Sequence, residues 1–172
     1  MLESVRVPAL AISIRQPWAE LILSGRKRME VRTWVPSYRG PLWLHVGQKT
    51  ADRDLESRFG LGNLFRGGFA GIIQLRAVLP LTPDRWTAWK HLHLDDGEFR
   101  SGFYAWLLSG PIRFAEPVWS PGSLQLFEPG QSVLEQLRKL LAEDFPTTRE
   151  QKVTNQSIDS HGKNCCRKIY SR

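Results

Sequence analysis

The sequence predicts an α+β fold, a small mixed β-barrel with two or three short helices packed on it. Three observations support this prediction. Five to seven short segments with the pattern of strands follow one another, with turns rich in proline and glycine between them. Helical patterns are few and short, whereas a doubly wound α/β fold needs a long helix between each pair of strands. A chain of 172 residues, 41% of them hydrophobic, is long enough for one domain with a core and short for two.

The N-terminal part is predicted to form a strand, a short helix and a second strand. Apolar residues alternate with other residues over 10–14, which is typical of a strand. Pro17 suits the first position of a helix, where its missing N–H is not needed, and Gly25 can adopt the left-handed conformation that ends one. The helix is therefore expected over 17–24. Alternation resumes over 29–34, which predicts the second strand.

The middle of the chain is predicted to supply two more strands and one helix. Alternation over 41–47 and an apolar run over 69–81 are both typical of strands, and the density of Ile, Leu and Val in the second indicates burial on both faces. Thr50 is a suitable N-cap for a short helix over 50–59. Residues 82–102 are rich in loop-forming residues and are expected to form a loop.

The last elements are predicted to be strands followed by one amphipathic helix. A strand is expected over 103–110, and two shorter ones within 111–128. The helix is expected over 132–145, because Ser132 and Glu135 have the spacing of a capping box at its start. One apolar stripe runs along this helix, made of Val133, Leu134, Leu137, Leu140 and Leu141.

The domain is expected to occupy residues 1–145, followed by a basic tail over 146–172. Periodicity is lost in this tail, which predicts that it is disordered or becomes ordered only on binding. Cys165 and Cys166 lie within it, and two adjacent cysteines without another pair are expected to be free thiols. No metal or other cofactor is predicted.

The charge of the chain is uneven and favours a polyanionic partner. The net charge is +7, divided into +5 for residues 1–50, −2 for 51–145 and +4 for 146–172. Such asymmetry suits RNA. No apolar run is long enough to cross a bilayer, and the N-terminus lacks the pattern of a signal peptide, so we expect a soluble, cytoplasmic protein without a membrane partner.

Three charged residues close together, Lys27, Glu30 and Arg32, are the strongest candidates for function. Glu30 and Arg32 leave the same face of their predicted strand, Trp34 continues that face, and Lys27 lies in the bend before it. Lysine and arginine can hold phosphate or carbonyl oxygens, a carboxylate can accept from an exocyclic amine or move a proton, and an indole ring can stack on a base. The same pattern also fits a solvated ion pair on an exposed edge strand.

The segment 9–47 resembles the opening of an ASCH domain, the activating-signal-cointegrator homology family within the PUA-like superfold. The family pattern is a Gly-x-Lys-x-x-Glu-x-Arg string at the end of the first helix. In this chain the string is complete and consists of Gly25, Lys27, Glu30 and Arg32. The similarity is strongest over about residues 9–128. We call the string of Gly25, Lys27, Glu30 and Arg32 the motif.

The resemblance implies a β-barrel with a cleft beside the first helix, lined by the motif side chains, and an RNA or nucleotide-like ligand. Lys27 and Arg32 would hold phosphate or carbonyl oxygens, and Glu30 would read an amine edge. Either of two tryptophans would stack on a base. Further ligand-binding candidates at or near the cleft are Arg15, Gln16, Trp18, Trp34 and His45.

Two alternatives to RNA binding remain open. Some small ASCH proteins are amidohydrolases that act on N4-acetylcytidine, and Lys27 and Glu30 would be the catalytic candidates here. In those enzymes the residue three positions after the lysine is a threonine nucleophile, whereas this chain has Glu30. The other alternative is a protein-interaction module in transcription or translation, whose partner would bind the helix at 132–145 and the basic tail.

Overall fold

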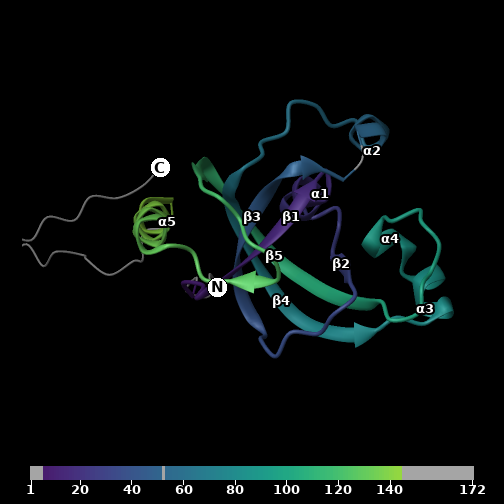
Figure 1. Ribbon diagram of the computed structural model, residues 1–172. Coiled ribbons are helices and arrows are strands. Elements are labelled where there is room, and N and C mark those ends of the chain that lie inside the picture. The colour runs from purple at the N-terminus through teal and green to yellow at the C-terminus, as the bar shows by residue number, and fades with distance from the viewer. Residues whose placement is uncertain (1–5, 52, 145–172) are drawn as a thin grey trace, which may run out of the picture.

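A six-stranded mixed sheet, curled into a half-barrel, forms the centre of the molecule in the computed structural model, which describes residues 6–51 and 53–144 (Figure 1). The strand order is β2-β5-β4-β3-β1-β6. The strands are β1 (Leu10–Gln16), β2 (Met29–Arg32), β3 (Gly40–Thr50), β4 (Gly68–Pro80), β5 (Tyr104–Trp119) and β6 (Leu126–Phe127). The helices are α1 (Trp18–Leu23), α2 (Arg53–Arg58), α3 (Pro83–Ala88), α4 (Lys90–His93) and α5 (Gln131–Asp144).

The pairing of the strands determines what lies beside the motif. β1 runs parallel to β3, and the other pairs are antiparallel. The motif strand β2 is at one edge of the sheet and pairs only with the start of β5, where Glu30 is opposite Trp106. Directly opposite residues of an antiparallel pair project from the same face, so Glu30 shares its face with the buried Trp106.

Two hydrophobic clusters cover opposite faces of the sheet. Alternation in β3 divides Leu42, Leu44 and Val46 from Trp43, as the sequence predicts. The face that includes Trp106 packs against α1, and we call it the α1 face. The opposite face packs against α5, and we call it the α5 face. Figure 1 shows these two helices on different sides of the curled sheet.

The segment 82–102 differs from the expected loop because it contains two short helices, α3 and α4. Thr82 caps α3 by accepting a hydrogen bond from the backbone N–H of Arg85, and Pro83 occupies the first turn. Trp86 is buried in a third cluster with Met29 of β2. The prediction of a loop was wrong because these helices are too short for a periodic pattern and are stabilised by this long-range packing.

Other boundaries also differ from the prediction, among them that of α1, which begins at Trp18 with Pro17 at the N-cap position instead of the first helical position. β5 is one strand of 16 residues that continues through Gly110, at a φ of 55°, where two strands were expected. Thr50 ends β3 instead of capping α2, which begins at Arg53. α5 begins at Gln131, so Ser132 lies inside the helix and is not its N-cap. The predicted stripe of α5 does pack on the sheet, with Leu137 and Leu141 buried.

The predictions for residue 145 and for the tail at 146–172, with Cys165 and Cys166, concern residues outside the described ones. Among the helices formed by residues 6–51 and 53–144, none has the length and apolar character required to cross a membrane.

Candidate ligand-binding site

The bend between α1 and β2 holds Lys27 in place. Gly25, at a φ of 75°, adopts the left-handed conformation that only glycine takes without strain, and this turns the chain after α1. The backbone N–H of Lys27 then donates to the carbonyl of Leu21 at 2.8 Å. The next N–H, that of Arg28, donates to the carbonyl of Leu92 at 3.0 Å, so the bend is tied to α4. The side chain of Lys27 therefore starts from a fixed backbone.

Lys27 is enclosed by protein. Only 3% of its side chain is exposed, and its ammonium donates a hydrogen bond to the backbone carbonyl of His93. Its Nζ lies 3.7 Å from Oε2 of Glu30 and 4.6 Å from the centre of the Trp18 ring. Burial lowers the pKa of the Lys27 amine, and the neighbouring Glu30 carboxylate opposes that shift.

Glu30 and Arg32 lead from this enclosed lysine towards solvent. Nε of Arg32 lies 3.2 Å from Oε1 of Glu30, and Nη2 of Arg32 donates to the carbonyl of Ser13 at 3.1 Å. Side-chain exposure rises from 3% for Lys27 to 11% for Glu30 and 25% for Arg32. Nε of Arg32 is buried and makes no hydrogen bond, so its contact with the Glu30 carboxylate is an ion pair only. Nη1 of Arg32 makes no hydrogen bond to a described residue and is not buried, so it is the donor available at the exposed end of the row.

The two candidate stacking residues are partly buried beside this row. The ring of Trp18 meets Phe59 edge-on, with centroids 6.1 Å apart. The ring of Trp34 meets Trp106 edge-on at 4.6 Å, and Nε1 of Trp106 donates to the carbonyl of Trp34. Trp34 lies beyond the last residue of β2. Packing therefore restrains both rings without burying either of them completely.

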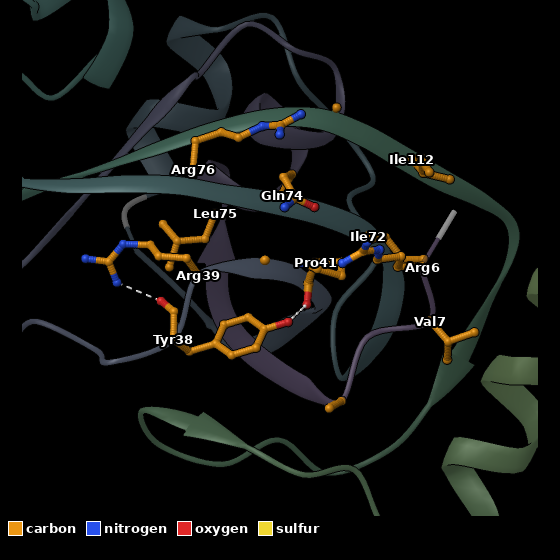
Figure 2. A pocket seen from close by; sticks show the side chains of 13 residues that line it. Arg6, Val7, Tyr38, Arg39, Pro41, Ile72, Gln74, Leu75, Arg76 and Ile112 are labelled. Carbon is orange, nitrogen blue, oxygen red and sulfur yellow. Dashed lines mark hydrogen bonds between the residues drawn. The ribbon is translucent and has the colours of Figure 1, made fainter. Parts of the chain in front are cut away.

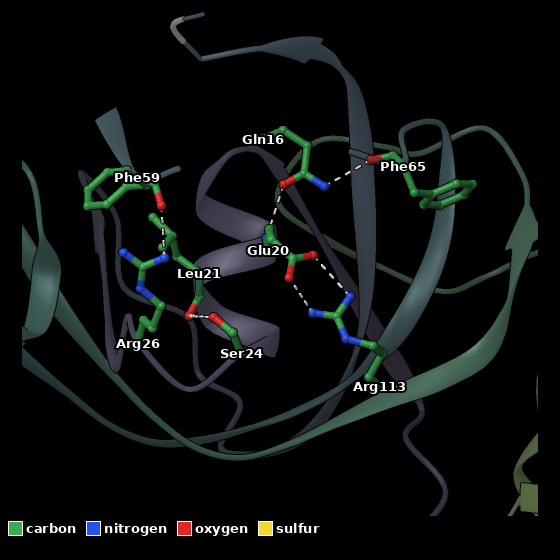
Figure 3. Close-up of polar contacts among 8 residues, drawn as sticks. All are labelled: Gln16, Glu20, Leu21, Ser24, Arg26, Phe59, Phe65 and Arg113. Carbon is green, nitrogen blue, oxygen red and sulfur yellow. Dashed lines mark hydrogen bonds and ion pairs between the residues drawn. The ribbon is translucent and has the colours of Figure 1, made fainter. Parts of the chain in front are cut away.

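The side chain of Gln16 is held by hydrogen bonds to the backbone, whereas its neighbour Arg15 is exposed. Figure 3 shows the amide of Gln16 between two segments: its Oε1 accepts from the N–H of Glu20 at 3.0 Å, and its Nε2 donates to the carbonyl of Phe65 at 2.9 Å. The same view shows Arg113 of β5 paired in bidentate fashion with the Glu20 carboxylate. These contacts anchor the start of α1, whereas the exposed Arg15 is left at the surface.

His45 is not brought to the motif. It is 2% exposed and packs against Phe69 and Phe127 on the α5 face. Its Nε2 lies 2.9 Å from the carbonyl of Ser120, which can only accept, so Nε2 carries the proton and Nδ1 accepts from the Ser13 hydroxyl at 3.0 Å. Burial lowers the pKa of His45, in agreement with a neutral ring.

The residue that sequence reasoning missed at this site is His93. Its carbonyl accepts from Lys27, and its buried ring stacks on Trp86 with centroids 4.2 Å apart. Both ring nitrogens are used, because Nε2 bonds the carbonyl of Trp86 and Nδ1 accepts from the N–H of Asp95. No pattern near Lys27 indicates this contact, which joins residues 66 positions apart. No three His, Cys, Asp or Glu side chains of the described segments converge as a metal site would require.

Two hollows stand out on the described surface, and neither is lined by the motif. One has a volume of about 450 Å³ and lies between α2 and α4, beside the Arg58–Asp96 ion pair. The other has a volume of about 870 Å³ and lies over the middle of β4. The cleft that the resemblance implies beside α1 stays a prediction.

Comparison with a family model gives a match to the ASCH domain over residues 12–118. Among curated proteins, Activating signal cointegrator 1 from Mus musculus and its counterpart from Homo sapiens are each 35% identical over 57 residues. That alignment covers 33% of this chain and 10% of either relative, so the chain matches about a tenth of the length of these proteins.

Comparison with solved structures gives the same family. The crystal structure of ASCH from Zymomonas mobilis and that of a point mutant of it each align with a TM-score of 0.54 and 16% identity. These alignments cover 76% of this chain and 94% and 96% of the two solved chains. Similarity at this level of identity shows a common fold.

Proposed function

Because the chain belongs to the ASCH domain family, whose model matches residues 12–118, we propose that it binds RNA or a nucleotide-like ligand at the motif. The observation that carries the proposal is the convergence of three motif charges. Lys27, Glu30 and Arg32 form one row of contacts that ends in a partly exposed guanidinium, whose Nη1 makes no hydrogen bond to a described residue. A solvated ion pair on an edge strand would be far more exposed than this row.

Arg32 is the proposed contact to phosphate or carbonyl oxygens. One of its N–H groups is used by the carbonyl of Ser13, and Nη1 makes no hydrogen bond to a described residue. A guanidinium fork matches phosphate or carbonyl geometry through two parallel hydrogen bonds. Glu30 lies beside it and can accept a hydrogen bond from the exocyclic amine of cytosine or adenine.

Lys27 is better suited to position Glu30 than to touch the ligand. Its ammonium is 3% exposed and already contacts a carbonyl, a carboxylate and an indole ring. It therefore supplies a fixed positive charge behind Glu30, and we assign direct contact with the ligand to Glu30 and Arg32. Trp18 and Trp34 remain the proposed stacking surfaces.

The proposal is tested by titrating fluorescein-labelled single-stranded and structured RNA and following fluorescence anisotropy at several salt concentrations. Arg32→Gln should weaken binding about tenfold, the equivalent of one charge-assisted hydrogen bond. Arg28→Gln is the matched control, because Arg28 is a nearby exposed arginine outside the motif. Equal affinity of the two variants, or an affinity that does not change with salt, would contradict the proposal.

A second candidate function is amide hydrolysis of an N4-acetylcytidine-like nucleoside. One observation favours it: burial lowers the pKa of Lys27, and a lysine with a lowered pKa can act as a general base. Water would attack the acetyl carbonyl, the C–N bond would break, and cytidine and acetate would be released. Chromatography of the nucleoside after incubation decides this, since cytidine must form with the native chain and not with Lys27→Met.

A protein-interaction module is supported by the printed name of the two curated relatives, a signal cointegrator, over the 57 aligned residues. The apolar stripe of α5 is turned towards the sheet, so a partner would meet the polar side of this helix. If both assays above are silent, capture of partners with the full chain and with Arg138→Glu, an exposed substitution on α5, becomes the test.

A further inference from the structure

The hollow over β4 is separate from the motif. Ile72 and Ile112 of its lining pack in the α5 cluster, whereas Leu75 and Tyr38 of its lining pack in the α1 cluster. Glu30 of the motif shares its face with Trp106, which belongs to the α1 cluster. None of the motif residues lines the hollow.

The hollow is basic. Three arginines from three separate segments line it: Arg6 before β1, Arg39 before β3, and Arg76 in β4. No aspartate or glutamate is among its lining residues, and no carboxylate of the described chain lies within ion-pair distance of these arginines. All three side chains belong to exposed residues. Three positive charges are thus gathered without compensation by a carboxylate of the described residues.

The arginines are anchored in a way that leaves donors for a ligand. Nη1 of Arg39 donates to the carbonyls of Pro36 and Tyr38, at 2.8 and 2.6 Å. Nε of Arg76 donates to the hydroxyl of Ser109 at 2.7 Å. Those acceptors are neutral and occupy one side of each guanidinium, so Nη2 of Arg39 and both terminal nitrogens of Arg76 remain available. The guanidinium of Arg6 makes no hydrogen bond to any described residue.

A rigid wall gives the hollow its form. Gly40, at a φ of 139°, lets the chain fold back so closely that a Cβ at this position would lie 2.8 Å from the Tyr38 hydroxyl. That hydroxyl donates to the carbonyl of Pro41 at 2.7 Å, which fixes the ring. Figure 2 shows Arg39 beside this wall, Arg76 and Arg6 on other sides, and the amide of Gln74 between them.

We infer that this hollow is a second RNA-binding surface, which holds successive phosphates of the RNA backbone. Guanidinium groups on different sides of a hollow of about 870 Å³ suit an extended polyanion better than a single phosphate ion. All three basic residues are arginines, whose forks hold phosphate by two hydrogen bonds. The inference rests on the proposed function only in taking RNA as the polyanion, and does not require the motif to touch RNA.

The test compares two triple variants that lose the same charge. The hollow variant carries Arg6→Gln, Arg39→Gln and Arg76→Gln. The control carries Lys49→Gln, Arg100→Gln and Arg138→Gln, three exposed residues that do not line the hollow. Affinity for a labelled 12-nucleotide single-stranded RNA is measured from 50 to 300 mM KCl. Circular dichroism and thermal melting verify that both variants are folded.

The hollow variant should lower the slope of log affinity against log salt by about 2, because each phosphate contact to a single strand contributes about 0.7. The control should change the slope by less than half of this. Equal effects in the two variants would overturn the inference, and so would displacement of the RNA by a polyglutamate peptide at equal charge concentration, which would indicate an acidic protein partner.

NMR spectra can distinguish RNA binding at the motif from RNA binding at the hollow. In ¹H–¹⁵N spectra, RNA should shift the Gln74 side-chain amide and the Gly40 and Gly110 backbone signals, in Arg32→Gln as in the native chain. Loss of these shifts only in the hollow variant supports the second surface. Absence of these shifts in the native chain, while Arg32→Gln still weakens binding, would leave the motif proposal standing and remove this one.

Discussion

The ammonium of Lys27 donates a hydrogen bond to the backbone carbonyl of His93, a residue 66 positions further along the chain. The contact joins the bend that carries the motif to the end of α4, and it is buried. It explains why a charged side chain is tolerated in the interior: the ammonium has a carbonyl, a carboxylate and an aromatic ring around it. The motif lysine is therefore part of the fold as well as a candidate for function.

The first prediction concerns the stability of this contact. Lys27→Met keeps the length of the side chain and removes its charge, which leaves the carbonyl of His93 without its donor and Glu30 without one cation. The free energy of unfolding should fall by about 1–3 kcal/mol. Urea denaturation measures it, with Lys49→Met, at an exposed position, as the control that should change it little.

The second prediction is a pH dependence. Burial lowers the pKa of Lys27 in the folded protein below its ordinary value of 10.5. Between the folded pKa and 10.5 the unfolded state binds more protons, so the contribution of Lys27 to the free energy of unfolding increases as pH rises. The stability of the native chain relative to Lys27→Met should therefore grow from pH 7 towards pH 10.5. A constant difference across this range would contradict the lowered pKa.

The third prediction concerns what Glu30 recognises. Glu30→Gln keeps the shape of the side chain but turns one acceptor into a donor, which opposes an exocyclic amine. The native chain should prefer oligocytidine to oligouridine, and the variant should lose most of this preference while its affinity for oligouridine changes less. Anisotropy titrations with the two labelled RNAs measure it. An unchanged ratio in a folded variant would count against base reading by Glu30.

The fourth prediction concerns the environment of His45. A Cβ added at Gly122 would lie 2.3 Å from Cε1 of His45 and 2.5 Å from Oγ of Ser13, so Gly122→Ala must displace the buried ring. The free energy of unfolding should fall by about 1–3 kcal/mol. Gly130→Ala is the matched control, because a Cβ there meets nothing within 4 Å. RNA affinity should stay near the native value in both, since His45 neither belongs to the row of motif charges nor lines the hollow over β4.

Much of the fold could be predicted from short-range patterns, and the rest depends on contacts between distant segments. Alternation in β3 separates Trp43 and His45 from Leu42 correctly, but the pattern does not indicate which face is packed against α1. The sequence places His45 among the ligand-binding candidates because its strand follows the motif strand, whereas in the structure it packs on the α5 face. The helices at 82–102 depend on burial of Trp86 beside Met29, which no local periodicity shows.

In the candidate site, too, local patterns predict some features, and contacts between distant segments determine the others. The spacing of Lys27, Glu30 and Arg32 predicts their convergence, because the bend and the strand are local structures. The depth of Lys27 could not be predicted, since His93 encloses it from a distant segment.

The position of β2 at the sheet edge has a consequence for any shortened form of this protein. Its ladder partners are residues 104–107 of β5, and the carbonyl that receives Lys27 belongs to residue 93. A fragment that stops before these residues would keep the complete Gly-x-Lys-x-x-Glu-x-Arg string and still be unable to arrange it. During synthesis, the motif leaves the ribosome well before its last structural support at residues 104–107, so it takes its final geometry only after most of the domain has been made.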